Sequence, residues 1–282
     1  MTLPADYSAP TYDDRIRQVA PQPSRPEFLW LKNSDQSLQR AWSLSLPHDL
    51  TDRRVVDGPP PALPPNEGFR RIFAVDRGED HRHRLASVYG VKDAATALEV
   101  AWDRLRLANT GNAGYRALRP LLQEVVSVPP ETRSLTHSWE TLSRVNTDKH
   151  ALVIPFLQDE AVYALPAVLP VDTIAWDVSV AMRILWLAHG GGLFEDTVAC
   201  HDLALDALDL IRSTYSSWRE VADGIVVGRA LSTGRVDESC IAYVDQVAIA
   251  LNHPDSPWVR LPLHENARGE LTPHRYRGGH AP

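Results

Sequence analysis

The sequence predicts an all-α fold, a compact multi-helix domain with an irregular, proline-rich N-terminal region. Three observations support this prediction. From residue 81 onward, apolar residues recur at spacings of three and four, the period of an amphipathic helix. Capping residues precede these segments, and glycine or proline follows them. The chain has 282 residues, 44% of them hydrophobic, which is enough to build a sizeable core.

Residues 1–66 form the predicted proline-rich, partly irregular region. Residues 1–27 are rich in proline and polar side chains, and we expect either a flexible arm or a strap across the surface. Ser34 and Asp35 are candidate caps for a short helix that reaches about Trp42. The run GPPPALPP at 58–65 excludes helix and central strand, and it serves either as a stiff connector or as a ligand for an aromatic groove.

Residues 67–263 form the predicted helical domain, and the basic residues 264–282 a flexible tail. Asp93 stands at an expected helix start. The turn NTGNAG at 109–114 should separate this helix from the next, which runs from Tyr115 to Val126. The apolar stripe of the first helix consists of Ala94, Leu98, Ala101, Trp102 and Leu105.

The clearest helix runs from Asp172, a candidate cap, to about His189. Three glycines at 190–192 should end it. We expect a second helix from Glu195 or Asp196 to about Tyr215, and a fourth after Asp237. The third begins at a capping box, formed by Ser217 and Glu220.

The charge pattern limits the classes of partner. The net charge is −7, which disfavours nucleic acid and anionic lipid, so we expect neither as a partner. Residues 151–250 hold fourteen Asp and Glu against five Arg and no Lys. This half suits a basic protein partner, unless it is simply a solvated acidic surface. No apolar run is long enough to span a bilayer, and only Cys200 and Cys240 are available for a disulfide, so we expect a cytoplasmic protein.

The most specific local pattern is Ser217-Trp218-Arg219-Glu220 followed by Gly228-Arg229. Trp218 should bury against the bundle. Glycine in mid-helix costs about 1 kcal/mol relative to alanine, so Gly228 predicts that a helix or a bulky ring passes close by. Arg229 is then expected to reach Asp177 or Glu220, either as a structural pin or as part of a site.

Two sets of polar residues are candidates for chemistry. Asp177, Arg183, Glu220 and Arg229 can together form a cleft for a phosphate or a carboxylate, with catalytic roles left open.

Asp202, Asp206 and Asp209 share one helix face and are weak candidates for Mg²⁺ or Mn²⁺. The alternative is the wet side of an amphipathic helix. We predict no metal and no cofactor.

The segment from Thr173 to Gly234 resembles a bacterial family known as domain of unknown function 1266, which includes the YbeU-like and YbeR-like proteins. The matching motifs are Ala175-Trp176-Asp177, a glycine-rich turn, Ser217-Trp218-x-Glu220, Gly228-Arg229, Ser256-Pro257-Trp258 and Leu261-Pro262. A weaker match at Tyr89-Gly90-Val91 extends the resemblance from Leu85 to Leu263.

The chain departs from the family pattern at two positions. Val180 stands where the family often has arginine, with Arg183 the nearest substitute, and Ile225 stands where it often has tyrosine. Because the family has no agreed chemistry, the resemblance implies a fold and leaves the function open.

Two classes of function remain. The first is a cytoplasmic helical protein-binding module, in the setting of a bacterial toxin, immunity or defence system. It is favoured by the acidic helical half, the proline-rich segment and the lack of a complete catalytic signature. The second is an enzyme or a small-molecule sensor that binds a phosphate- or carboxylate-bearing ligand. Convergence of the four candidate cleft residues on an open pocket would favour the second class.

Overall fold

The computed structural model describes residues 10–17, 35–48, 78–129, 135–194, 198–253 and 256–264. Within these ranges the chain forms helices, turns and bends and no strand, so the all-α prediction is confirmed. The segments predicted at 58–65 and at 265–282, and the helix start at Glu195 or Asp196, lie outside the described residues.

The described residues form a series of α-helices and two shorter helical turns. Leu85–Tyr89 is a π-helical turn and Thr147–Lys149 a 3₁₀ turn. The α-helices are α1 Tyr12–Arg17, α2 Gln36–Ser43, α5 Gly78–Arg84, α6 Ala94–Asn109, α7 Ala113–Val126, α8 Leu135–Ser143, α9 His150–Leu157, α10 Ala161–Ala164, α11 Ile174–Gly190, α12 Val198–Thr214, α13 Trp218–Thr233, α14 Glu238–Asn252 and α15 Pro257–Arg260.

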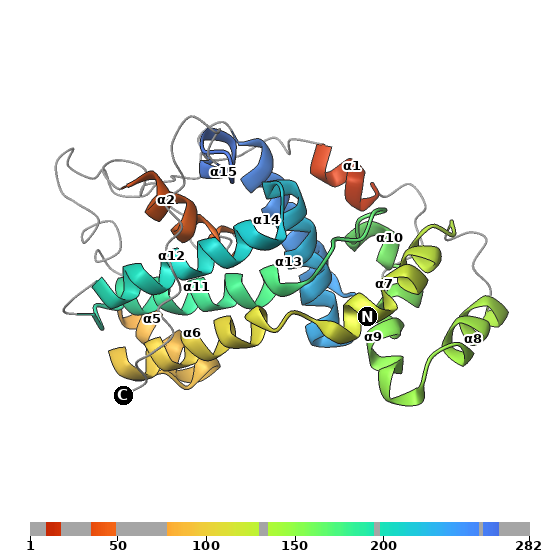
Figure 1. The fold of residues 1–282 in the computed structure, drawn as a ribbon, viewed down its shortest axis with the longest axis horizontal. Helices are drawn as coiled ribbons and strands as arrows, with labels where there is room; N and C mark the ends of the chain where they lie inside the picture. Colours follow the sequence, from red (N-terminus) through yellow and green to blue (C-terminus); the bar gives the residue numbers. More distant parts are fainter. Residues whose placement is uncertain are drawn as a thin grey trace.

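Helix α11 is the central element of the bundle. In Figure 1 it lies between α12 and α6, with α13 crossing near its start. Its most extensive contacts are with α6 and α13. Val178, Ala181, Ile184 and Leu185 are fully buried, as are residues on its other faces, because a helix with partners on several sides must be apolar nearly all round.

The predicted helix ends depend on local signals, and most of them are confirmed. Gly90 and Gly192 lie after helical segments with φ of 70° and 69°, the left-handed conformation that glycine adopts without strain. Side chains that accept a hydrogen bond from a backbone N–H of the first helical turn are Asp35, Asp93, Ser217 and Asp237. The cap predicted at Asp172 is wrong, because Thr173 occupies the N-cap position of α11.

Two further expectations are refined. Trp102, predicted in the apolar stripe of α6, is 47% exposed. Part of the N-terminal region is a strap, since α1 packs on α14. The Tyr12 hydroxyl donates to Asp223 Oδ1 at 2.5 Å, and Arg15 pairs with Asp245 at 3.2 Å.

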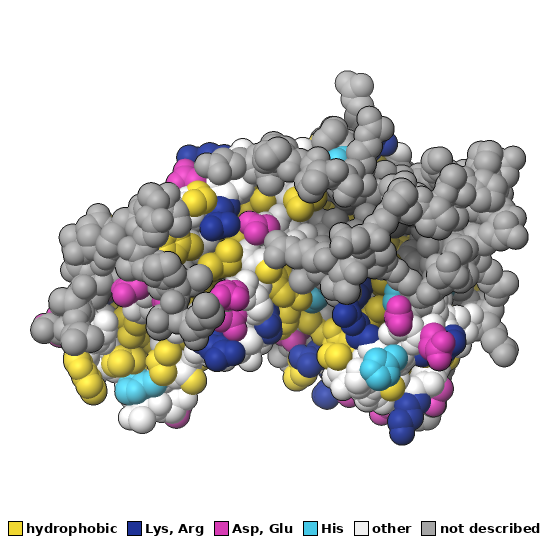
Figure 2. Space-filling view, turned by 180° about the vertical axis from the view of Figure 1, so that it is seen from behind, with side chains coloured by type: hydrophobic (Ala, Val, Ile, Leu, Met, Phe, Trp, Pro, Cys, Tyr) yellow, Lys and Arg dark blue, Asp and Glu magenta, His cyan; other side chains and the backbone are white. Residues whose placement is uncertain are grey.

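None of the described helices is long and apolar enough to cross a membrane. Figure 2 shows that, among described residues on the face opposite to Figure 1, acidic and basic side chains are interspersed with hydrophobic ones. On that face the acidic excess of the sequence is therefore not gathered into one patch.

Candidate functional site

Asp177 and Glu220, two of the four candidate cleft residues, have separate partners. Asp177 of α11 pairs with Arg104 of α6, with Nη1 and Oδ1 3.1 Å apart. Glu220 Oε2 accepts a hydrogen bond from the backbone N–H of Ser216 at 2.7 Å, so this carboxylate closes the start of α13. No hydrogen bond or ion pair joins Arg229 to either carboxylate in the described part of the chain, so the predicted contact is wrong.

Arg183 lies inside the bundle on α11. It is 3% exposed, and its guanidinium lies over the ring of Trp186, with Cζ 4.8 Å from the ring centroid. Burial lowers the pKa of Arg183 to about 9, because desolvation disfavours the charged form. Arg183 therefore contributes positive charge to the interior of the fold.

Gly228 allows α13 to approach α11 closely, as the sequence predicts. An ideal Cβ on Gly228 would lie 2.4 Å from Trp176 Cβ and 3.0 Å from the Thr173 carbonyl oxygen. Any larger residue would have to push the start of α11 away. The close approach places the Trp176 ring beside Arg229, which follows Gly228 in the chain.

Three aromatic rings gather at this point. His48, Trp176 and Tyr243 lie with ring centroids 5.3 to 5.5 Å apart. The Ser179 hydroxyl donates to the Trp176 carbonyl at 2.7 Å, so Ser179 Oγ accepts from His48 Nε2 at 3.0 Å. Nδ1 of His48 then accepts from the Tyr243 hydroxyl at 2.8 Å. The contacts thus assign one neutral tautomer to His48.

The electrostatics of the cluster agree with this assignment. Burial, together with the positive charges of Arg183 and Arg229, lowers the pKa of His48 to about 3. Burial is also the main cause that raises the pKa of Tyr243 to about 12. Both side chains are therefore neutral at pH 7, and the net charge of the cluster comes from the two arginines.

Arg229 is the residue of the cluster that retains unused hydrogen-bond donors. Its Cζ lies 5.5 Å from the Trp176 ring centroid and 5.8 Å from that of Tyr243, within the range of cation–π contacts. Nη2 donates to Ser239 Oγ at 2.9 Å, while the buried Nε has no hydrogen-bond partner. Arg229, Trp176 and Tyr243 are each partly exposed, so solvent reaches the edge of the cluster.

Sequence reasoning missed His48, Ser179 and Tyr243. The His48–Ser179 contact spans 131 positions and the Tyr243–His48 contact spans 195. No spacing rule connects such positions. The one available signal was a single histidine, His48, at the end of a segment after Trp42 in which leucines alternate with serines.

Trp218 of the Ser-Trp motif is structural. It stacks on Trp258, with centroids 5.0 Å apart and an interplanar angle of 5°. Its Nε1 donates to the Leu261 carbonyl at 2.7 Å. This contact joins the start of α13 to the Ser-Pro-Trp segment that follows α14.

The aspartates of α12 are exposed and do not form a metal site. Among the described residues, no group of three or more His, Cys, Asp or Glu side chains could hold a metal ion. Asp206 and Asp209 instead help to line a groove of about 220 Å³ between α6 and α12. The other lining residues are Trp102, Leu105, Arg106, Asn109, Leu203, Leu210 and Ser213.

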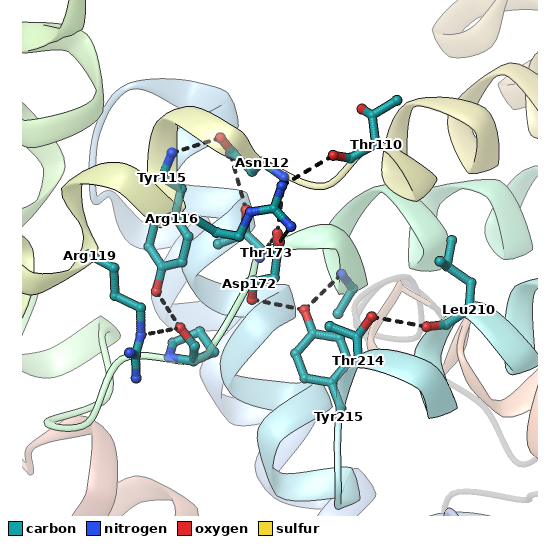
Figure 3. A network of polar contacts seen from close by, with 12 residues as sticks. Thr110, Asn112, Tyr115, Arg116, Arg119, Asp172, Thr173, Leu210, Thr214 and Tyr215 are labelled. Carbon is teal, nitrogen blue, oxygen red and sulfur yellow. Dashed lines mark hydrogen bonds and ion pairs between the residues drawn. The ribbon is translucent and has the colours of Figure 1, made fainter.

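A second polar network, at the junction of α7, α11 and α12, is centred on Asp172. Figure 3 shows Asn112, Arg116 and Thr173 gathered around its carboxylate. Oδ1 accepts from the backbone N–H groups of Asn112, at 3.1 Å, and Thr173, at 2.7 Å. Oδ2 lies 3.4 Å from Arg116 Nη1. This side chain, 5% exposed, thus has three partners.

Two tyrosines complete the junction. The Tyr215 hydroxyl donates to the Asp172 carbonyl at 2.8 Å and accepts from the Ala175 N–H at 3.2 Å. The Tyr115 hydroxyl donates to the Pro170 carbonyl at 2.8 Å. Burial raises the pKa of both tyrosines, so both remain neutral donors. The network positions the first turn of α11, on which Trp176 lies.

The comparisons with known proteins identify a family that covers most of the chain. No curated protein and no solved structure matches the chain. The family described as "Protein of unknown function (DUF1266)" matches residues 84–263, which include the α11, α13 and α14 residues of the cluster. This match covers well over half of the 282 residues, and the chain belongs to the DUF1266 family.

Proposed function

We propose that this protein is a protein-binding module that holds a basic segment of a partner in the groove between α6 and α12. One observation carries the proposal, namely the composition of that groove. It has an apolar lining from Leu105, Leu203 and Leu210, and two aspartates on the α12 side. Trp102, 47% exposed, adds an aromatic ring. A lysine or arginine side chain can bury its stem on such a lining while its charged head meets a carboxylate.

The groove already holds one cationic side chain of the chain itself. Arg106 lies with Cζ 5.7 Å from the Trp102 ring centroid, and its Nε is 3.5 Å from Asp103. Both Arg106 and Asp103 are well exposed, so this ion pair is weak and a partner can displace it. The arrangement illustrates how a partner's guanidinium would bind to Trp102.

The setting that we propose is cytoplasmic and bacterial, with kinship to the YbeU-like and YbeR-like proteins. Cys200 and Cys240 are both buried free thiols, which supports a reducing compartment. A toxin, immunity or defence system remains our proposed biological context, since a module with an acidic binding groove suits the neutralisation of a basic partner protein.

The test compares a groove variant with a matched control. Trp102→Ala/Asp209→Asn alters the groove, whereas Trp139→Ala/Asp202→Asn removes an exposed tryptophan of α8 and an exposed aspartate of α12 that do not line it. The tagged full-length chains are used to capture partners from native lysate, with cross-linking and mass spectrometry to map the contact. The dissociation constant of each retained protein is then measured by calorimetry.

We expect a partner whose basic segment cross-links to α6 and α12. The groove variant should raise the dissociation constant of this partner at least about tenfold, and the control variant should raise it less than about twofold. The reason is that a desolvated aromatic and charge contact is worth more than about 1.4 kcal/mol. Equal binding by both variants, or no partner that cross-links to these helices, would exclude this function for the groove.

A further inference from the structure

We propose that Arg229, flanked by Trp176 and Tyr243, is a binding site for the carboxylate or phosphate group of a small molecule. This site is separate from the groove between α6 and α12, and the proposal is independent of a protein partner. Three features of the described residues support it: the donors that Arg229 leaves unused, the lack of a paired carboxylate, and the rings that fix the guanidinium.

Arg229 makes few of the hydrogen bonds that it can make. A guanidinium has five N–H donors. In the described part of the chain the Arg229 side chain makes one hydrogen bond, from Nη2 to Ser239 Oγ. The buried Nε donates to no atom, and a buried donor without an acceptor is a rare and costly arrangement. Nη1 also makes no hydrogen bond and is not among the buried atoms, so it is the unused donor that an oxyanion can reach.

No carboxylate of the described residues lies within ion-pair distance of Arg229. By contrast, Arg15 and Arg104 each pair with an aspartate at 3.1 to 3.2 Å. The nearest acidic group in the hydrogen-bond chain is Asp237, whose Oδ1 accepts from Ser239 Oγ at 2.5 Å. Ser239 thus stands between the two charges and occupies the place that a direct ion pair would take. The uncompensated charge of Arg229 also contributes to the low pKa of His48.

The guanidinium is held in place before any ligand binds. Trp176 is fixed against Gly228 by backbone packing, and Tyr243 is fixed by its hydrogen bond to His48. Both rings lie within 6 Å of Arg229 Cζ, which restricts the rotation of the side chain. A side chain ordered in advance loses little entropy when it binds an anion.

The partial exposure of the cluster indicates the size of the ligand. Solvent reaches Arg229, Trp176 and Tyr243, yet Nε itself is buried. A single oxyanion group can bind at Nη1, which makes no hydrogen bond and is not among the buried atoms, with the rest of the molecule lying over the exposed edges of the two rings. A macromolecular surface would have to protrude to reach the same atom.

The experiment follows the Nε–H resonance of Arg229 by NMR in the full chain, labelled with ¹⁵N-arginine in a chloride buffer. Inorganic phosphate and succinate are titrated separately, because they distinguish a phosphate from a carboxylate ligand. The resonance is assigned from its loss in Arg229→Gln. Arg144→Gln is the matched control, since Arg144 is 56% exposed and pairs with Glu124, outside the contacts that connect Arg229 to Asp237.

We expect one of the two anions to shift the Arg229 Nε–H resonance saturably, with a dissociation constant below about 5 mM. Binding should weaken at least about tenfold in Arg229→Gln, as followed by Trp176 fluorescence against a Trp176→Phe reference. Arg229→Lys should bind less tightly than wild type, because lysine keeps the charge without the planar fork. Arg144→Gln should bind as wild type does.

The titration itself uses the unaltered protein, and a variant is needed only to assign the resonance. Arg229→Lys also removes the arginine Nε–H group, so it provides a second assignment if Arg229→Gln fails to fold. If neither anion shifts the Arg229 resonance, or if Arg144→Gln weakens binding as much as Arg229→Gln, the assignment is overturned. Under those outcomes Arg229 is a structural contact between α13, α11 and α14.

Discussion

The two polar networks at the start of α11 differ in how many of their hydrogen-bonding groups are used. At the junction of α7, α11 and α12, the Asp172 carboxylate has three partners and the Tyr215 hydroxyl both donates and accepts. The second network surrounds Arg229 of α13, which packs beside Trp176, four residues after Asp172. There one donor of Arg229 is used and its buried Nε has no acceptor.

This difference separates a structural network from a candidate site. A buried network that satisfies all its members adds stability and fixes geometry. A preorganised cation with unused donors lowers stability slightly and is available to a ligand. Both networks contact the first turns of α11. The Asp172 network therefore holds this helix in the position that the Arg229 cluster requires.

The close approach of α11 and α13 supports both networks, and breaking it should have the largest effect. In Gly228→Ala the new Cβ would lie 2.4 Å from Trp176 Cβ, so the helices must separate. We expect a loss of at least about 3 kcal/mol in the free energy of unfolding, measured by urea denaturation followed by circular dichroism. Gly78→Ala is the control, because its Cβ would meet no atom closer than 3.6 Å.

A change of less than about 1 kcal/mol in Gly228→Ala would contradict the packing seen at this crossing. If the variant folds, its Trp176 ring is displaced from Arg229. Anion binding at Arg229 should then also weaken.

The contrast between the networks predicts that two polar substitutions differ in cost. Asp172→Ala leaves the N–H groups of Asn112 and Thr173 without an acceptor and removes the ion-pair partner of Arg116. It should cost about 3 kcal/mol in the free energy of unfolding. Arg229→Gln loses one hydrogen bond but also removes a buried donor that has no acceptor. It should therefore lower the free energy of unfolding by less than about 1 kcal/mol.

Asp209→Asn, an exposed change on α12, should lie within about 0.5 kcal/mol of wild type and serves as the reference in the same denaturation experiment. Equal losses of unfolding free energy for Asp172→Ala and Arg229→Gln would mean that the Arg229 cluster uses its hydrogen-bonding groups as fully as the Asp172 network does.

The part of this architecture that the sequence could predict is the part set by neighbouring residues. The caps at Asp93, Ser217 and Asp237 depend on N–H groups two or three positions away, so local patterns suffice. Gly228 was predictable for a related reason: its cost within a helix needs a compensating contact, and Trp176 provides it. The family motifs around α11 and α13 were visible in the same way.

The choice of partner for each polar residue was not predictable. Asp177 lies near enough to the cluster to suggest Arg229, yet it pairs with Arg104, 73 positions earlier, because α6 packs along α11. The aspartates of α12 could be assigned to one face, but the groove that two of them line exists only because α6 lies opposite. The cluster of His48, Trp176 and Tyr243 joins three segments that are distant in the sequence, and only tertiary packing brings them together.

The last stability prediction concerns the protonation of His48. The pKa of His48 is lowered from its usual 6.5 to about 3 in the folded chain, so the unfolded state binds a proton more readily. The stabilisation from neutral His48 is complete above pH 6.5 and decreases as the pH falls towards 3. Between pH 7.5 and pH 5 we expect the unfolding free energy to decrease by about 2 kcal/mol from this group.

His48→Gln isolates this contribution, because every other titrating group is common to both proteins. The stability difference between wild type and His48→Gln should shrink by about 2 kcal/mol when denaturation is repeated at pH 5 instead of pH 7.5. The positive charges that face His48 come from Arg183 and Arg229, and Tyr243 stays neutral throughout this range. A saturating oxyanion at Arg229 should reduce the shrinkage, since it screens one of the two charges that, together with burial, lower the pKa of His48. Parallel pH profiles for the two proteins would show that His48 is not held neutral, and the positive field assigned to the cluster would then be wrong.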